Sequence, residues 1–276
     1  MDQEKGSLKI MPMGDSITQG FKVPGGYRRP LYDILTGQGY GVDYLGRFRQ
    51  KGDPTKDADH WGRPGLGITD TDEIIGGRSY VSLQANEGSG GAVRHGLYED
   101  LFEAISPAYF SRDPLDTNLL LLMAGTNDVV HQVVEKRNGA RAGGDRGNDG
   151  KGEQQDRIAE SGFDRFNAFI DRVNQRALAE DLRLEVVVGT IPDISRDWNR
   201  NGLRDPISDV MRKEVRQYNK RILDRYEDRS YSHIEVTAVD TFRAVGSSLA
   251  DGLHPSAAGF TRMAETWAQG IEQALA

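Results

Sequence analysis

Apolar residues along the chain gather in five short runs that have the character of β-strands. They are LKIMPM (8–13), VDYLG (42–46), NLLLLMAG (118–125), LEVVVGT (184–190) and IEVTAV (234–239). The third and fourth runs are apolar at almost every position, as strands buried on both faces of a parallel sheet should be. The pattern therefore predicts five strands, two of them covered on both sides.

Between these runs lie segments with the apolar spacing of amphipathic helices. Residues 163–180 place one stripe of apolar side chains on a helix: Phe163, Phe166, Phe169, Ile170, Val173 and Ala177. Residues 210–227 repeat the design with Val210, Val215, Tyr218, Ile222 and Leu223. Strands that alternate with helices imply right-handed crossovers, so we predict an α/β fold with a doubly wound parallel sheet. Such sheets bind ligands at the carboxyl ends of their strands.

The length of 276 residues fits one large domain, and neither an internal repeat nor a break in composition marks a second one. We therefore predict a single domain over residues 1–276. The segment at 135–157 differs from the rest, because it is rich in glycine and in charges of both signs and has almost no apolar residue. We expect a flexible surface insertion there. A flap over a ligand site is the alternative, since the segment begins a few residues after a strand end.

The charge and the residue types argue against several classes of protein. A formal net charge of -7 argues against a nucleic-acid partner, which usually requires a basic surface. The chain has no cysteine, which excludes disulfides, cysteine nucleophiles and thiolate metal sites. No apolar run approaches the roughly 20 residues that span a bilayer, and the first ten residues lack the pattern of a signal peptide. We expect a soluble chain, either cytoplasmic or secreted after loss of a leader, and the composition leaves this choice and the oligomeric state open.

The first strand-like run ends in small polar residues, in the stretch IMPMGDSITQG (10–20). One interpretation is that Asp15 or Ser16 caps the next helix, as such residues often do. The other is that Ser16 is a nucleophile, exposed by the turn at the end of the strand. The stretch alone does not decide between them.

A serine nucleophile needs a base for its proton, a group that orients the base, and donors for the oxyanion. Of the 5 histidines, only His254, in LADGLHPSAAGF, has such an orienting carboxylate at short range in its motif, three residues earlier. On a tight turn this spacing can bring the Asp251 carboxylate against one imidazole nitrogen, so that the other faces the serine. The alternative is a simple turn at residues 251–252 and a helix entered at Pro255.

Candidate oxyanion donors follow two other strands. In MAGTNDVV the side-chain amide of Asn127 can donate, although an Asn-Asp pair after a strand often caps a helix instead. In DADHWGRPGLGITD, Gly65 and Gly67 allow the main chain to approach a ligand and donate an N–H. All four motifs follow predicted strands in chain order, at the edge where a doubly wound sheet binds ligands.

Together the four motifs resemble the four blocks of the SGNH, or GDSL, hydrolases. The matching stretches are GDSIT at Ser16, the glycine of RPGLGI, GTND at Asn127, and DGLHP at Asp251 and His254. They span residues 14–255, nearly the whole chain. The resemblance implies a three-layer α/β/α fold of the flavodoxin-like kind with a five-stranded parallel sheet. It also implies a hydrolase of acyl esters that needs no cofactor and no metal.

The resemblance further implies a role for each motif residue. Ser16 is the expected nucleophile, His254 the general base, and Asp251 its partner in a catalytic triad. The N–H groups of Ser16 and Gly65 and the side chain of Asn127 are the expected oxyanion hole. On this interpretation, the serine ends its strand because the turn there exposes its hydroxyl at the site.

Within the family, about the first 70 residues are most similar to carbohydrate esterases of the acetyl xylan esterase group. The segment HWGRPGLGI departs from that group, which often has an acidic residue where this chain has Trp61 and a serine where it has Pro64. We expect a serine esterase for short acyl groups, above all acetyl, on a carbohydrate or another small molecule. The alternatives are a lipid or thioester acylhydrolase, an acyltransferase, and a carbohydrate-binding protein without activity.

The candidate substrate-binding residues are Asp15, Trp61, Arg63 and Trp198. The two tryptophans can stack on a sugar ring or, equally, anchor long loops by burial. The arginine can contact a polar substrate group, or it can pair with Asp57, Asp59 or Asp70. Trp267, on the last predicted helix, we expect in the core.

Overall fold

The computed structural model describes residues 5–68, 96–130, 132–133, 151–195, 206–226 and 229–276. Of the predicted insertion at 135–157, residues 135–150 lie outside this set. Residues 151–157 form the first turns of a helix, whose side chains are described from residue 161 onward. The prediction of a flexible insertion therefore stays a prediction for residues 135–150.

Five long strands form the centre of the molecule in the order β2-β1-β5-β6-β8, and each neighbouring pair is parallel. Their bounds are β1 Lys5–Gly14, β2 Tyr40–Tyr44, β5 Asp116–Met123, β6 Leu184–Gly189 and β8 Ile234–Val239. Each contains most of one predicted run, so the five predicted strands and the parallel sheet are confirmed. β5 and β6, the two almost continuous apolar runs, lie in the interior of the sheet.

Three short strands extend the sheet beyond the prediction. They are β3 Phe48–Arg49, β4 Asp59–Gly62 and β7 Arg229–Ser230. β4 runs parallel to the last residues of β1 and antiparallel to β3, and β7 is antiparallel to β8. The sheet is therefore 8-stranded rather than five-stranded. Such short runs do not show a periodic pattern, which is why the sequence did not reveal them.

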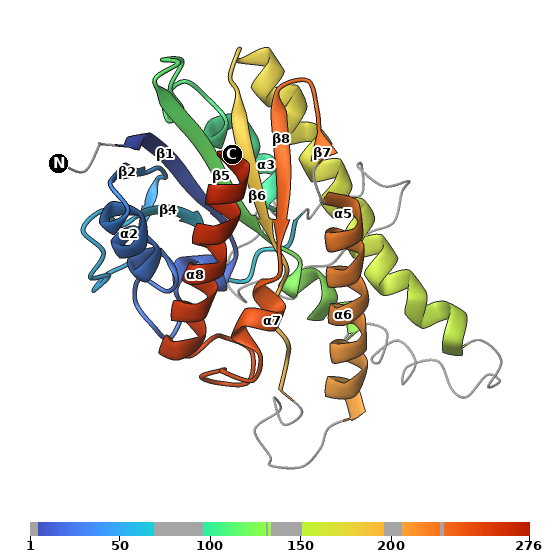
Figure 1. Cartoon of the computed structure of the whole chain (residues 1–276). Coiled ribbons are helices and arrows are strands. Elements are labelled where there is room, and N and C mark those ends of the chain that lie inside the picture. Colours follow the sequence, from blue (N-terminus) through green and yellow to red (C-terminus); the bar gives the residue numbers. More distant parts are fainter. Residues whose placement is uncertain (1–4, 69–95, 131, 134–150, 196–205, 227–228) are drawn as a thin grey trace, which may run out of the picture.

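Helices cover both faces of the sheet and complete the three layers (Figure 1). α2 (Arg28–Gly37) and α8 (Ala257–Ala274) pack together on one face, and α5 (Lys151–Ala179) and α6 (Pro206–Tyr226) on the other. α3 (Leu97–Ala104) packs against α5, and the short α7 (Thr241–Val245) packs against α8. α1 (Ser16–Gln19) is a single turn that follows β1.

The two predicted helices lie within α5 and α6, whose inward faces agree with most of the predicted stripes. In α5 the stripe is buried except for Phe163, which is partly buried. The buried apolar residues of α6 are Met211, Val215, Tyr218, Ile222 and Tyr226. Val210 and Leu223 are only partly buried, at the margins of that face. The buried positions, spaced by three or four residues, include Met211 and Tyr226 instead.

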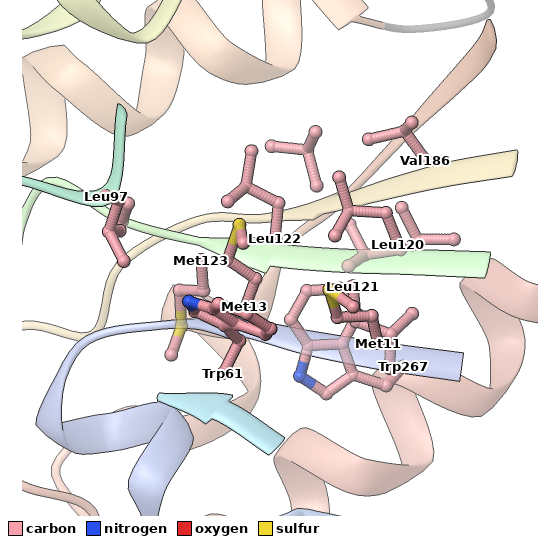
Figure 2. Packing of buried hydrophobic residues seen from close by; sticks show 14 of the residues in the cluster. Met11, Met13, Trp61, Leu97, Leu120, Leu121, Leu122, Met123, Val186 and Trp267 are labelled. Atoms are coloured by element: carbon pink, nitrogen blue, oxygen red, sulfur yellow. The ribbon is translucent and has the colours of Figure 1, made fainter. Parts of the chain in front are cut away.

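The core lies between the sheet and the helices, and side chains of the central strands fill it (Figure 2). Met11 and Met13 of β1 are in register with Leu120 and Leu122 of β5. Trp267 of α8 is fully buried in this core, as predicted. Its ring would lie 2.6 Å from a Cβ at the last residue of β6, so this close packing requires the glycine that stands there.

The strand order reverses between β1 and β5. From β1 the chain passes first to β2 on one side, and all later long strands are added on the other side. In sheets with this order, ligands bind in the crevice at the carboxyl ends of the two strands where the order reverses. Ser16 follows β1 and Asn127 follows β5, so the topology brings the first and third motifs to this crevice.

Candidate active site

Three of the predicted residues form a continuous hydrogen-bonded chain. Ser16 Oγ lies 2.9 Å from Nε2 of His254. Nδ1 of the same imidazole lies 2.9 Å from Oδ2 and 3.1 Å from Oδ1 of Asp251. An ionised carboxylate only accepts hydrogen bonds, so Nδ1 carries the proton and Nε2 presents a lone pair to the serine hydroxyl. Serine, imidazole and carboxylate in this order have the geometry of a catalytic triad.

The end of β1 delivers Ser16 through a tight turn. Gly14 ends the strand, and a Cβ there would lie 2.2 Å from the Met123 carbonyl oxygen, so the turn requires glycine. Asp15 caps the one-turn helix α1 by accepting the Ile17 N–H at 2.9 Å. The capping interpretation is therefore correct for Asp15. Ser16 begins the helix with its hydroxyl turned to the imidazole, so the two interpretations of this stretch apply to neighbouring residues.

The turn at residues 251–254 holds the carboxylate against the imidazole. Oδ1 of Asp251 accepts the backbone N–H groups of Leu253 and His254 at 3.1 and 2.9 Å. The Ala250 N–H closes the turn on the His254 carbonyl at 2.7 Å. Burial by itself would raise the pKa of Asp251, but the hydrogen bonds from the backbone and ring of His254 lower the pKa below its ordinary value. The carboxylate is therefore charged at neutral pH.

The structure favours His254 over the other described histidines as the base. His60 is buried, and burial lowers its pKa to about 3, so it is neutral. His233 directly precedes β8 and lies at the opposite, amino-terminal edge of the sheet. His95 and His131 lie outside the described residues.

Asp15 is a second carboxylate beside the triad, in surroundings unlike those of Asp251. It is 1% exposed, and its Oδ2 has no hydrogen-bond partner among the described residues. Burial raises the pKa of Asp15 to about 6, although the Ile17 N–H, the Thr126 side chain and the nearby His254 oppose this shift. Asp15 is therefore a poor candidate for substrate binding, because a buried capping side chain offers no surface to a substrate.

The candidate oxyanion donors come from the loop after β4 and from the helical residues 126–130 that follow β5. Nδ2 of Asn127 donates to the Leu66 carbonyl at 2.9 Å. Gly65 has a φ of 77°, a left-handed conformation that favours glycine. The loop after β4 is tied to β1, because the Arg63 N–H donates to the Gly14 carbonyl at 2.9 Å. The second and third motifs are therefore in contact, beside the end of β1.

Asp128 is a residue of this region that the sequence analysis left without a role. Its carboxylate accepts the Ile68 N–H at 3.0 Å and the Nε–H of Arg165 at 3.1 Å. The ion pair is buried, with 6% of the Arg165 side chain and 2% of the Asp128 side chain exposed. It joins the loop after β4 and the helical residues after β5 to α5. The signal was present in the motif GTND, where the aspartate directly follows the candidate amide donor.

Arg28 is a second residue that the sequence analysis missed. It is fully buried in the first turn of α2 and pairs with Asp53 at 2.7 Å. The same guanidinium donates to three main-chain carbonyls, those of Thr18, Gln19 and Ala58, at 3.1, 3.0 and 3.1 Å. It therefore satisfies carbonyls at the end of α1, which helix geometry leaves without partners. The signal in the sequence was a charged residue on the same helical face as Leu31 and Leu35.

Two candidate substrate residues have structural partners instead. Trp61 is fully buried and its indole N–H donates to Asp100 at 3.0 Å, so it anchors its loop and presents no ring face to a ligand. Nη1 of Arg63 pairs with both carboxylate oxygens of Asp100, at 3.0 and 3.1 Å. An ion pair for Arg63 was expected, but the partner lies on α3 rather than among the aspartates nearby in sequence. Trp198 and Asp70 lie outside the described residues.

The described residues were compared with the requirements of a metal site and of a membrane span. Within them, no group of three or more histidine, aspartate or glutamate side chains is placed to hold a metal ion. In the same part of the chain, no helix combines the length and the hydropathy needed to cross a bilayer.

Comparison with known proteins identifies the family. Residues 10–267 match the model of the family described as GDSL-like lipase/acylhydrolase. The match covers nearly the whole chain, so the chain belongs to this family. The resemblance carried by the four sequence motifs is thereby confirmed.

One esterase is similar to this chain in sequence, and two carbohydrate esterases are similar to it in structure. The chain is 27% identical over 277 residues to a multidomain esterase of Ruminococcus flavefaciens, a match that covers 97% of this chain and 29% of that protein. A family 3 carbohydrate esterase of Clostridium thermocellum has a TM-score of 0.58 and 20% identity, with 98% of each chain covered. A carbohydrate esterase family 3 protein from Talaromyces cellulolyticus has a TM-score of 0.56 and 18% identity, with 98% of this chain and 97% of that chain covered. At these identities the two structures establish a shared fold.

Proposed function

We propose that the chain is a serine esterase that removes a short acyl group from an alcohol through an acyl-enzyme intermediate. The observation that carries the proposal is the unbroken hydrogen-bonded chain from Ser16 through His254 to Asp251. Its position at the carboxyl edge of a doubly wound sheet, where the strand order reverses, agrees with a ligand site.

In the proposed mechanism, Ser16 Oγ attacks the ester carbonyl and its proton passes to Nε2 of His254. The charged Asp251 carboxylate stabilises the imidazolium that forms. The imidazolium then gives its proton to the departing alcohol, and the acyl group stays bound to the serine. Water, deprotonated by the same imidazole, attacks the acyl group, releases the acid and restores the serine.

We assign the oxyanion hole to the backbone N–H groups of Ser16 and Gly65 and to the side-chain amide of Asn127. The contact between Asn127 and the loop after β4 supports this assignment, because it brings two of the three donors to one place. The amide nitrogen carries two hydrogens. One is directed at the Leu66 carbonyl, which orients the group and leaves the second for the oxyanion.

We propose acetyl esters of carbohydrates as the substrate class. The carbohydrate esterases that share the fold and the multidomain esterase related in sequence support this choice. The motifs themselves support a short acyl group, because no long apolar stretch that would line an extended acyl channel lies near them in sequence.

The test is hydrolysis of p-nitrophenyl esters from acetyl to octanoyl, with Ser16→Ala measured beside the parent protein. We expect activity on the shortest esters and its loss in the variant. A preference for long chains would replace the proposed substrate class with a lipid or thioester acylhydrolase. Absence of any Ser16-dependent hydrolysis would contradict the mechanism and favour a binding protein.

The role of Asn127 can be tested separately. We expect Asn127→Ala to lower kcat by about a hundredfold to a thousandfold, since a single oxyanion donor has an effect of this size. The matched control is Asn174→Ala on α5, whose side chain instead accepts the His233 N–H at the amino-terminal edge. Equal melting temperatures would show that both variants fold, and a near wild-type rate for Asn127→Ala would remove it from the oxyanion hole.

A further inference from the structure

An exposed phenylalanine lies directly against the base of the proposed triad. The ring centroid of Phe21 is 4.7 Å from that of His254, and the side chain is 40% exposed. Its backbone N–H donates to the Ser16 carbonyl at 2.9 Å, which fixes it just beyond the candidate nucleophile. The ammonium of Lys22 lies 4.9 Å from the centre of the same ring. A large apolar ring that stays exposed beside the reacting groups is suited to contact a ligand.

The segment that begins at Phe21 continues into a hollow of about 270 Å³ between α2 and α8. Residues of the segment 23–33 line one side, and Ala257 and Thr261 line the other. One wall of the hollow therefore begins at Ala257, three residues beyond His254, and the other begins at Val23, two residues beyond Phe21. Its volume is close to the lower end for small-molecule pockets, roughly 300 Å³. A hollow of this volume has room for a small ring.

The walls of this hollow combine apolar faces with charged groups. Pro24 and Pro30 supply rigid apolar surface, and Arg29 and Asp33 are exposed on α2. Neither of these two charged side chains takes part in an ion pair within the part of the chain that the structure describes. A sugar ring has apolar C–H faces and a rim of hydroxyl groups. Aromatic and proline surfaces match the faces, and a guanidinium and a carboxylate match the hydroxyls.

We propose that Phe21 and this hollow bind the alcohol half of the ester, and that this alcohol is a pyranose ring. The inference rests on the proposed esterase function and adds to it the surface that contacts the leaving group. The departing alcohol must lie within hydrogen-bond reach of the His254 imidazole, which protonates it. Phe21 is the exposed ring in contact with that imidazole, so an alcohol in position to leave lies beside it.

The first experiment compares two acetyl esters that differ only in the alcohol, a monoacetylated methyl xyloside and ethyl acetate. The readout is the ratio of the two kcat/KM values, so that any general effect on His254 cancels. We expect Phe21→Ala to lower the ratio by about fivefold to tenfold, as for loss of one aromatic contact. Phe21→Tyr keeps the ring and should keep the ratio. The matched control is Phe102→Ala, which removes another exposed phenylalanine, 53% exposed, on α3.

The second experiment tests the hollow itself. Arg29→Ala and Asp33→Ala remove the two groups that would bind sugar hydroxyls, and each should raise KM for the xyloside ester about threefold to tenfold, the range for the net contribution of one solvent-exposed hydrogen bond. KM for ethyl acetate should change less. Arg225→Ala, at an exposed arginine of α6, is the control for the loss of a positive charge.

The outcomes separate the two proposals. If ethyl acetate is hydrolysed with dependence on Ser16 but the ratio is the same in Phe21→Ala and in the parent, the alcohol subsite is wrong and the esterase proposal stands. Failure to hydrolyse the xyloside ester, with ethyl acetate still hydrolysed, also overturns the subsite. If no ester is hydrolysed with dependence on Ser16, the proposed function fails and the subsite fails with it.

Discussion

Two turns meet at the candidate active site, and they are held in opposite ways. The nucleophile turn, residues 14–20, is largely buried, with Asp15 1% exposed and Thr18 fully buried. The triad turn, residues 250–254, lies at the surface, and 29% of the Asp251 side chain is exposed. A buried turn depends on other elements for hydrogen bonds, whereas an exposed turn can satisfy its polar groups locally and with water.

Two arginines show this difference directly. Arg28 is fully buried, donates to carbonyls of the nucleophile turn and pairs with Asp53. Arg262 on α8 is exposed and donates to the Ala244 and Val245 carbonyls before the triad turn, at 2.8 and 3.2 Å. Both arginines donate hydrogen bonds to main-chain carbonyls. Removal of the buried Arg28, however, would leave polar groups unsatisfied where water cannot reach them.

The carboxylates of the two turns differ in the same sense. Burial raises the pKa of Asp15 to about 6, because the Ile17 N–H and the Thr126 side chain offset the burial only in part. Burial acts against ionisation of Asp251 as well, but two backbone N–H groups and the His254 imidazole lower its pKa. The number of donors, together with the depth of burial, therefore decides which carboxylate is ionised more easily.

The largest expected effect concerns the triad turn. Asp251→Asn should lower kcat by about four orders of magnitude, since the amide no longer stabilises the imidazolium and favours the wrong imidazole tautomer. The amide oxygen can still accept the Leu253 and His254 N–H groups, so the turn should keep its shape. The measurement is kcat on p-nitrophenyl acetate, together with the melting temperature as a control for folding. Activity within tenfold of the parent would remove Asp251 from the triad.

The next effect concerns stability and compares the two arginines. Arg28→Met leaves the buried Asp53 carboxylate and three carbonyls without the guanidinium, so we expect a loss of about 3 to 5 kcal/mol in the free energy of unfolding. Arg262→Met should lose no more than about 1 kcal/mol, because water replaces an exposed guanidinium. Urea unfolding of both variants measures the difference. Equal losses would show that burial does not distinguish the two turns.

The smallest expected effect is the contribution of Asp15 to the pH dependence of the free energy of unfolding. Because its folded pKa of about 6 lies above the unfolded value near 3.9, its contribution favours the folded state below about pH 4 and is lost as the pH rises through 6. Asn can still cap the helix. Asp15→Asn should therefore gain stability relative to the parent between pH 4 and pH 8, by up to about 3 kcal/mol.

Urea unfolding at pH 4, 6 and 8 measures this gain, and Asp251→Asn, measured at pH 2, 3 and 4 as well, provides the control with the opposite sign. Because the folded pKa of Asp251 is lowered, its contribution is present above the unfolded pKa and is lost as the pH falls. The Asp251→Asn variant should therefore lose stability relative to the parent as the pH rises from about 2 to about 4, and its difference from the parent should stay nearly constant between pH 4 and pH 8. If neither variant differs from the parent in the pH dependence of its free energy of unfolding, the contrast between the two carboxylates is wrong.

Much of the fold could be predicted from the sequence, because local patterns report it. The continuous apolar residues of β5 and β6 indicated strands covered on both faces, and the spacing within 163–180 indicated the inward face of α5. The short strands β3, β4 and β7 escaped prediction, since runs of this length carry no period. The candidate triad was also within reach, because Asp251 and His254 are close in sequence and Ser16 stands in a recognisable motif.

What the sequence by itself determined is the order of strands and helices, the family, and the edge of the sheet at which its motifs gather. Only the tertiary structure decided which side chains meet across that edge. Trp61 and Arg63 both bind the Asp100 carboxylate on α3. Arg28 donates to a carbonyl at the end of α1, and Asp128 forms an ion pair with Arg165 of α5. The reason is that periodicity is local, whereas a buried polar group takes whichever partner the packing of distant elements brings within hydrogen-bond reach.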